Sequence, residues 1–212
     1  MDQHTPPDPD VVTTTQHSYA QIARQYADRW DTTESRWVAE EAARLAASLP
    51  GGALVADVGC GPGNDTVRLR GLGLRVHGFD LSHAMLTARD VPGQVRADLR
   101  TLPLRDGALD GLWCVAVLLH IPREHMPDAL AEFRRVLRPN GHALIGIAEG
   151  DGEGWERYPH LEGVPDRYFV YHSSAAFTAL LADAGLEILH TTRRSTHRDW
   201  LTLHVRRDAG VH

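Results

Sequence analysis

A glycine-rich turn with acidic residues around it carries the strongest chemical signal in this 212-residue sequence. Apolar residues at 53–58 lead into Gly59, Gly61 and Gly63, and Asp57 stands two residues before the first glycine. Glycine adopts positive φ at little cost and lets a ligand approach bare backbone. Open α/β sheets bind their ligands beyond the carboxyl ends of the strands. The turn therefore predicts a binding site at the end of a strand.

A second acidic residue follows at the spacing that a nucleoside site requires. Residues 74–79 have the character of the next strand, and Asp80 ends it, 21 positions after Gly59. A carboxylate in this place can accept hydrogen bonds from both hydroxyls of a ribose. Asp98 ends a further short strand, where it is placed to accept from an adenine amino group.

Three details favour S-adenosylmethionine over a dinucleotide as the ligand. The glycines follow a Gly-x-Gly-x-Gly spacing, whereas the Gly-x-Gly-x-x-Gly fingerprint sets a pyrophosphate on a helix N-terminus. Asp57 would repel a pyrophosphate, but it suits a ligand that carries an ammonium group. Asp80 and Asp98 add acceptors for a ribose and an adenine. A ligand with these groups and no phosphate is S-adenosylmethionine.

The same motifs resemble those of the class I S-adenosylmethionine-dependent methyltransferases. The matching motifs are 57–63, 78–86, 97–99, 109–113 and 132–142, and the resemblance as a whole extends over about residues 19–205. The resemblance implies S-adenosylmethionine as cofactor and S-adenosylhomocysteine as product. The cofactor-binding residues that we predict are Tyr19, Tyr26, Asp57, Gly59, Cys60, Gly61, Gly63, Asp80, Leu81, Met85, Asp98, Leu99 and Val115.

Methyl transfer from a sulfonium needs no metal, and it needs a general base only when the acceptor must lose a proton. The candidates for such a base are His120, after the fourth strand, and Tyr168 and His172 further along the chain. A packing role for His120 is an equally good interpretation. We predict no metal site, because the 13 histidines are scattered and form no helical His-x-x-x-His pair.

The elements that must position these residues alternate between strand and helix, which predicts a parallel sheet covered on both faces. The strands are predicted near 53–58, 74–79, 94–97, 109–116, 142–148, 186–192 and 199–206, and helices near 18–30, 36–49, 64–71, 82–89, 124–137 and 173–184. The resemblance implies an α/β fold: a Rossmann-like, seven-stranded mixed sheet, mostly parallel with the last strand antiparallel, and an N-terminal helical lid.

The domain organisation follows from the same pattern. Residues 1–15 are rich in Pro, Asp and Thr and are predicted to be a disordered tail. One methyltransferase domain is predicted over 16–212. Its parts are a helical lid (16–50), a cofactor-binding core (51–149), an acceptor-side insertion (150–172) and a closing helix and strand pair (173–206).

Two segments beside the core are rich in aromatic residues, and the resemblance implies that these segments form the acceptor pocket and its lid. Nine of the 14 aromatic residues are Tyr19, Tyr26, Trp30, Trp37, Trp155, Tyr158, Tyr168, Phe169 and Tyr171. Acidic residues at 149, 151, 153, 156, 162 and 166 outnumber Arg157 and Arg167. This rim could favour an aromatic or amine-bearing acceptor. The alternative interpretation is a solvated, charged loop.

Composition favours a small molecule as the partner. A net charge of −6 argues against binding to a phosphate backbone. No apolar run is long enough for a bilayer, and the polar N-terminus lacks the features of a signal peptide, so we expect a cytoplasmic protein without membrane partners. The alternatives that stay open are a nucleic-acid methyltransferase, a nicotinamide oxidoreductase and a protein that binds the cofactor without catalysis.

Overall fold

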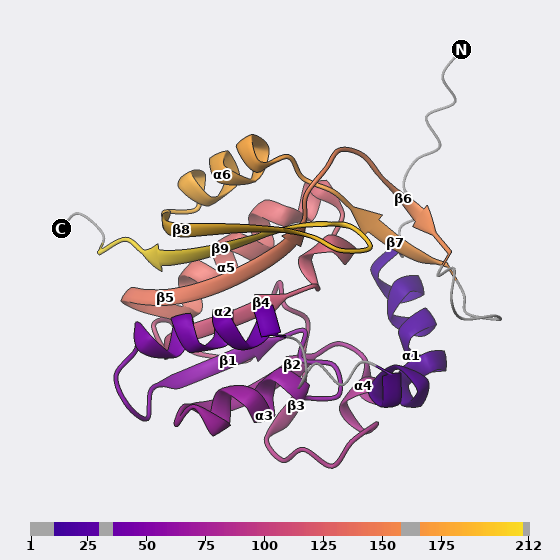
Figure 1. Ribbon diagram of the computed structural model, residues 1–212, viewed down its shortest axis with the longest axis horizontal. Coiled ribbons are helices and arrows are strands. Elements are labelled where there is room, and N and C mark those ends of the chain that lie inside the picture. The colour runs from indigo at the N-terminus through magenta and orange to yellow at the C-terminus, as the bar shows by residue number, and fades with distance from the viewer. Residues whose placement is uncertain (1–10, 30–35, 158–165, 210–212) are drawn as a thin grey trace.

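The computed structural model describes residues 11–29, 36–157 and 166–209, and a seven-stranded sheet runs through it in the order β3-β2-β1-β4-β5-β9-β8 (Figure 1). The strands are β1 (Leu54–Val58), β2 (Arg75–Asp80), β3 (Gln94–Arg96), β4 (Leu109–Val115), β5 (Leu137–Ala148), β8 (Leu186–Ser195) and β9 (Asp199–Arg207). β9 runs antiparallel to both neighbours, and the pairs among β1 to β5 are parallel. The predicted Rossmann-like mixed sheet is confirmed.

Helices cover both faces of the sheet. They are α2 (Arg36–Ala47), α3 (Asn64–Gly71), α5 (Met126–Val136) and α6 (Ser174–Asp183). Successive strand residues point to opposite faces, so Val55 and Trp113 pack in one apolar cluster with α2 and α3. Their neighbours Ala56 and Leu112 pack in the larger cluster that contains α5 and α6. Burial on both faces explains why these strands are continuous apolar runs in the sequence.

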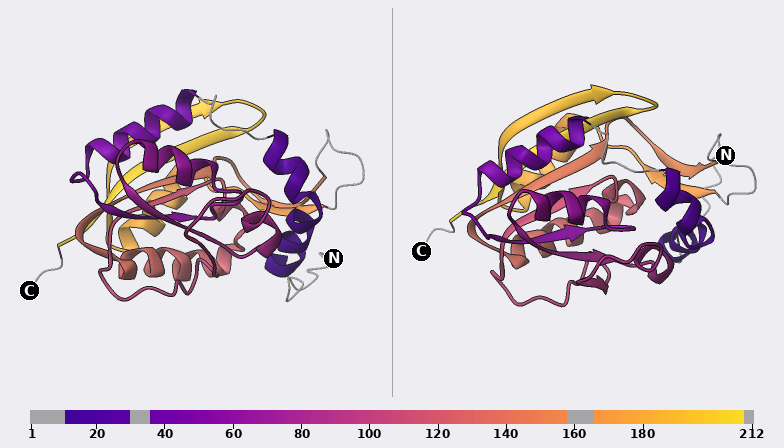
Figure 2. Two further views of the ribbon diagram at one scale, coloured as in Figure 1. Left: turned by 90° about the horizontal axis from the view of Figure 1, so that it is seen from below. Right: turned by 60° about the horizontal axis from the view of Figure 1, so that its bottom comes forward.

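A helix and a hairpin stand beyond the carboxyl ends of the parallel strands. The helix is α1 (Val11–Arg29), and the hairpin is formed by β6 (Glu153–Glu156) and β7 (Arg167–Val170). Both views of Figure 2 show α1 beside this hairpin, and α1 also contacts α4 (His83–Leu86). The predicted insertion thus contains a regular hairpin.

Contacts with β7 correct the predicted extent of the disordered tail. The Tyr168 N–H donates to Thr15 Oγ1 at 3.1 Å, and Ser18 Oγ donates to the Asp166 carbonyl at 2.8 Å. Val11 and Thr15 are buried in this packing. The prediction of disorder is therefore wrong for residues 11–15, because tertiary contacts order a stretch whose composition is polar. Residues 1–10 lie outside the described residues.

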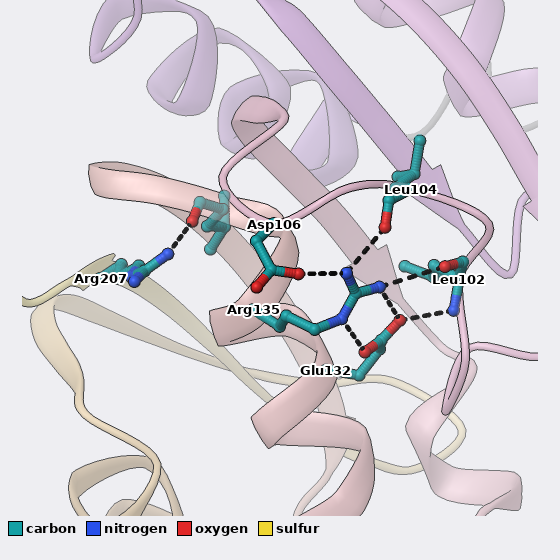
Figure 3. Close-up of polar contacts among 7 residues, drawn as sticks. Leu102, Leu104, Asp106, Glu132, Arg135 and Arg207 are labelled. Carbon is teal, nitrogen blue, oxygen red and sulfur yellow. Dashed lines mark hydrogen bonds and ion pairs between the residues drawn. The ribbon is translucent and has the colours of Figure 1, made fainter.

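An ion pair on α5 holds the loop that follows β3 (Figure 3). Glu132 accepts a hydrogen bond from the Leu102 N–H at 2.5 Å and forms an ion pair with Arg135 at 2.7 Å. Arg135 also donates to the Leu102 and Leu104 carbonyls and to Asp106. The loop begins with residues that we predict to face adenine, so this anchor helps to position the site.

Glu132→Ala is expected to lower the free energy of unfolding by about 2–3 kcal/mol, because it leaves the buried Leu102 N–H without its acceptor and removes the carboxylate that pairs with Arg135 on α5. Urea unfolding measures the change. Glu187→Ala is the matched control, because Glu187 pairs with Arg206 at 2.6 Å while both side chains are at least 40% exposed. That control should change the free energy by less than about 0.5 kcal/mol. Equal losses in the two variants would contradict the proposed anchor.

Candidate active site

A cavity of about 510 Å³ opens at the carboxyl ends of β1, β2 and β4, under α1 and β7. The predicted site residues that line it are Tyr19, Tyr26, Gly59, Cys60, Gly61, Asp80, Leu81, Met85, Asp98, Leu99, Val115 and His120. Four predicted residues do not line it: Asp57, Gly63, Tyr168 and His172. The structure therefore brings together most of the predicted cofactor residues and only one of the three candidates for a base.

The glycine turn is hydrogen-bonded to Asp80 at the end of β2. Gly59 and Gly61 have φ values of 72° and 53°. The Gly61 N–H donates to one carboxylate oxygen of Asp80 at 2.9 Å, and the Ser82 N–H donates to the other at 2.8 Å. Each carboxylate oxygen keeps a further lone pair, so Asp80 can still accept hydrogen bonds from a ligand in the cavity.

Asp57 lies behind the turn, whereas the sequence predicted it at the mouth. Asp57 is 2% exposed, and Thr66 Oγ1 donates a hydrogen bond to its carboxylate at 2.6 Å. Burial raises the pKa of Asp57 to about 8, and the Asp65 carboxylate acts in the same direction. Asp65 itself lines the cavity, in the first turn of α3, and accepts from Trp113 Nε1 at 3.1 Å. Asp65 is thus the acid that the sequence reasoning missed on this wall.

The opposite wall is largely apolar and carries one acid that is already paired. Leu81, Leu99 and Met85 line this part of the cavity. Asp98 accepts hydrogen bonds from the Arg100 guanidinium, the shortest at 2.6 Å, and this pairing lowers the pKa of Asp98. The carboxylate is therefore ionised and held in place, with less free accepting capacity than the sequence suggested.

Two predicted cofactor contacts have structural roles in the turn. Gly63 has a φ of 89° and precedes α3, and a Cβ at this position would lie 2.6 Å from Gln94 Nε2. The positive φ favours glycine here whatever the space, and Gly63 does not line the cavity. Cys60 lines the cavity, but burial raises the pKa of its thiol. We therefore assign Cys60 no nucleophilic role.

His120 is held at both ring nitrogens. Nδ1 lies 2.6 Å from the Tyr168 carbonyl oxygen, and Nε2 lies 2.8 Å from the Tyr19 hydroxyl. A carbonyl oxygen can only accept, so Nδ1 carries the proton and Nε2 accepts from Tyr19. The same hydroxyl accepts from Arg167 at 3.0 Å. Burial lowers the pKa of His120 to about 3, and the charges of Arg167 and Arg198 contribute in the same direction. His120 thus fastens α1 over the cavity.

We expect the imidazole of His120 to stay neutral from pH 8 to about pH 5, because burial disfavours its charged form. Nitrogen-15 NMR of labelled histidine can follow it, with His120→Asn used to assign the signal. The expected spectrum shows a constant Nδ1–H tautomer across this range. A titration of His120 near its ordinary pKa of about 6.5 would contradict the buried network.

Tyr168 and His172, the two other candidates for a base, do not line the cavity. Along β7 the residues alternate, so Arg167 and Phe169 line the cavity while the Tyr168 ring packs on Trp155, 5.5 Å between centroids. His172 is buried away from the cavity, and its Nδ1 lies 3.4 Å from an Arg123 nitrogen. Residues 167–170 are Arg-Tyr-Phe-Val and show no polar–apolar alternation, so no local pattern could have identified Arg167 as a cavity residue.

The predicted acidic rim is also not what the structure shows. Acids of this region pair with arginines: Glu149 with Arg193 at 2.9 Å, Glu153 with Arg123 at 4.0 Å, Glu156 with Arg198 at 3.4 Å, and Asp166 with Arg157 at 3.5 Å. Within the described part of residues 149–166, no acid lines the cavity, whereas Arg167 and Arg198 do. Trp30, Tyr158 and Glu162 lie outside the described residues.

Two further features of the described chain bear on the class of protein. None of the helices over 11–29, 36–157 and 166–209 has the length and apolar character needed to cross a membrane. Within the same residues, no three His, Cys, Asp or Glu side chains gather as a metal site would require.

Comparison with known proteins gives a family match inside the core. Residues 56–145 match the family model described as a methyltransferase domain. A malonyl-[acyl-carrier protein] O-methyltransferase of Serratia marcescens is 35% identical over 134 residues, which cover 58% of this chain and 50% of that protein. A tRNA (carboxymethyluridine(34)-5-O)-methyltransferase of Mus musculus is 32% identical over 134 residues, 61% of this chain and 19% of that protein. The chain thus spans half or less of the length of these relatives.

A solved structure shows the same fold over nearly the whole chain. It is the 1,6-didemethyltoxoflavin-N1-methyltransferase of Burkholderia thailandensis with bound 1,6-didemethyltoxoflavin and S-adenosylhomocysteine. Its TM-score is 0.77 at 21% identity, and the match covers 98% of this chain and 93% of that one. The family match identifies a methyltransferase domain over residues 56–145, and the fold of the chain is that of this solved methyltransferase.

Proposed function

We propose that this protein transfers the methyl group of S-adenosylmethionine to a small-molecule acceptor. The observation that carries the proposal is one cavity in which Asp80 and the Gly61 backbone form one wall and aromatic residues of α1 and β7 form another. The first wall has the chemistry for a nucleoside with an amino acid part. The second wall has room for an acceptor that is shielded from water.

The residues present fit this cofactor. Gly61 has positive φ at the cavity wall, where an ideal Cβ would already lie 3.2 Å from Met85 Cε. Asp80 offers acceptors for hydroxyl groups, Asp65 offers a carboxylate for an ammonium group, and Leu99 belongs to the apolar wall. A pyrophosphate would meet the negative charges of Asp80 and Asp65, so the fit argues against the nicotinamide alternative.

The role of the chain's own residues is to orient the reactants and exclude water. When bound, S-adenosylmethionine would supply a methyl group attached to a positively charged sulfur, and the neutral thioether is a good leaving group. α1, β7 and Trp200 enclose the space in which the acceptor would lie. Orientation and desolvation account for much of the rate enhancement in such displacements. His120 contributes by holding Tyr19 in the closed position, since its Nε2 lone pair is already engaged.

The open alternatives lead to different expectations for the acceptor. A relative that methylates tRNA is among the matches, which keeps a nucleic-acid acceptor in view. The net charge of −6 and the enclosed cavity favour a small molecule instead. A cofactor-binding protein without catalysis would share the first wall of the cavity but transfer no methyl group.

Calorimetry with S-adenosylhomocysteine tests the proposal directly. We expect saturable binding, and stabilisation of the fold by about 2.7 kcal/mol at a ligand concentration 100 times the Kd. NADH serves as the comparison ligand and should neither bind nor stabilise. Binding of NADH without binding of S-adenosylhomocysteine would overturn the proposal. Binding of S-adenosylhomocysteine without methyl transfer to any acceptor class would support the non-catalytic alternative.

A further inference from the structure

Two arginines line the cavity, one from β7 and one from the turn between β8 and β9. Arg167 begins β7 and is 3% exposed, and Arg198 lies in the turn between β8 and β9. Both guanidinium groups stack on the Phe169 ring, with Cζ 5.4 Å and 4.2 Å from its centroid. Phe169 and both arginines line the same cavity, so two positive charges lie together on its wall.

Both arginines are fixed by other contacts. Arg167 donates to the Tyr19 hydroxyl at 3.0 Å. Arg198 donates to the Tyr171 hydroxyl at 2.9 Å and pairs with Glu156 at 3.4 Å. A guanidinium that is held in place presents a planar set of donors, which matches the two oxygens of a carboxylate. This arrangement suits an anionic acceptor and opposes the amine-bearing acceptor that the sequence suggested.

The hydrogen bonds of the two histidines on the cavity wall are consistent with an acceptor that does not need to be deprotonated. His120 Nε2 accepts from Tyr19, so its lone pair is engaged. His197 is exposed on the turn between β8 and β9, with Nδ1 3.3 Å from Thr196 Oγ1. A carboxylic acid with an ordinary pKa of about 4 is already ionised at neutral pH and needs neither group as a base.

We propose that the acceptor is a carboxylate, oriented by Arg167 and Arg198, and that the product is its methyl ester. The inference rests on the proposed methyltransferase function. In the reaction, a carboxylate oxygen forms the new bond to the methyl carbon while the carbon–sulfur bond breaks and its electron pair goes to sulfur. The products are a neutral ester and a neutral thioether, so no proton is transferred. The ester has lost the charge that the arginines bind, which favours its release.

The first test is binding to the protein saturated with S-adenosylhomocysteine, measured by calorimetry. The probes are 2-naphthoic acid and decanoic acid, each compared with the amide and the amine of the same skeleton. We expect the acids to bind at least about 10-fold more tightly than their amides and amines, because charged hydrogen bonds are lost in the latter. Malonyl-N-acetylcysteamine adds a thioester-linked acid, and a preference for it would assign the carboxylate to a carrier-bound acceptor.

Charge variants connect this preference to the named residues. Arg167→Gln is expected to weaken acid binding about 10- to 100-fold and to leave amide binding unchanged. Arg167→Lys should be intermediate, because it keeps the charge and loses the planar set of donors. Arg157→Gln removes the same charge from an 83% exposed side chain beside the hairpin and should bind acids like the parent protein. Binding of S-adenosylhomocysteine by each variant shows that it is folded. If Arg167→Gln does not bind S-adenosylhomocysteine, Arg198→Gln is used in its place.

Product chemistry gives the deciding readout. With a tritium-labelled methyl group, a methyl ester releases its label as methanol in mild alkali, whereas methyl ethers and methylamines keep it. Alkali-stable label, tighter binding of amines than acids, or absence of acid binding to protein that binds S-adenosylhomocysteine would each overturn the proposal. Failure to bind S-adenosylhomocysteine would instead overturn the proposed function.

Discussion

Asp80→Ala should reduce the affinity for S-adenosylhomocysteine by about 10- to 100-fold, equivalent to about 1.5–3 kcal/mol for lost hydrogen bonds to a charged group. The carboxylate lies on the cavity wall at the end of β2, and its oxygens accept the N–H groups of Gly61 and Ser82. The change therefore removes a ligand acceptor and also releases the glycine turn. Calorimetry of the folded variant measures the effect.

Two further variants test whether the loss of the Asp80 charge causes the loss of affinity for S-adenosylhomocysteine. Asp80→Asn keeps the shape, but its amide nitrogen would face one of the two N–H donors, so we expect nearly the same loss. Asp90→Ala removes an exposed acid shortly after α4 and should leave the affinity unchanged. Affinity of Asp80→Ala within about threefold of the parent protein, less than about 0.7 kcal/mol, would contradict the assignment of Asp80 to the ligand.

Gly59→Ala is expected to lower the free energy of unfolding by about 2–5 kcal/mol, from a strained backbone and an overpacked contact. Gly59 has a φ of 72°, and an ideal Cβ there would lie 2.5 Å from Val117 Cβ. This part of the Val117 side chain cannot rotate away, so the backbone of the turn or of the loop after β4 must shift. Denaturant unfolding measures the loss, and calorimetry should show weaker cofactor binding as well.

Gly52 provides the matched control. Its φ is 71°, and a Cβ there would meet nothing within 4 Å. Gly52→Ala should therefore show the backbone strain alone, about 1–2 kcal/mol. Adding Val117→Gly to Gly59→Ala should recover the part of the loss that comes from the clash. If Gly52→Ala and Gly59→Ala cost the same, the close approach of the two loops has no energetic role.

Local patterns in the sequence were sufficient for the sheet and for placing the glycine turn and Asp80 at the cavity. Helix α3 begins and ends at residues 64 and 71 as predicted, because a glycine turn fixes its start and Gly73 follows its end. The central strands were recognisable because each is buried on both faces. β5 begins at Leu137, earlier than the predicted 142, because Leu137 already pairs with Leu109 of β4.

The differences arise where tertiary contacts decide the structure. α4 covers only His83–Leu86 of the predicted 82–89, in a segment whose neighbouring Arg89 binds α1 and Asn64. Asp57 is buried because it lies inside a strand between two others, which its position near the glycines did not reveal. Arg167 was counted as one charge in an acidic loop, since no pattern in a four-residue strand showed that it would point into the cavity.

The hydrogen bonds between α1 and β7 have a consequence for the kinetics of turnover. Thr15 and Ser18 join the helix to the hairpin, and Arg89 joins the Ala27 carbonyl of the helix to Asn64 of the core. Because these hydrogen bonds join α1 to the hairpin, we expect the two elements to move together. The cofactor and the acceptor would then enter and leave the cavity through the same opening. We therefore expect neither product to leave ahead of that common opening, which makes one conformational step the limit for the release of both.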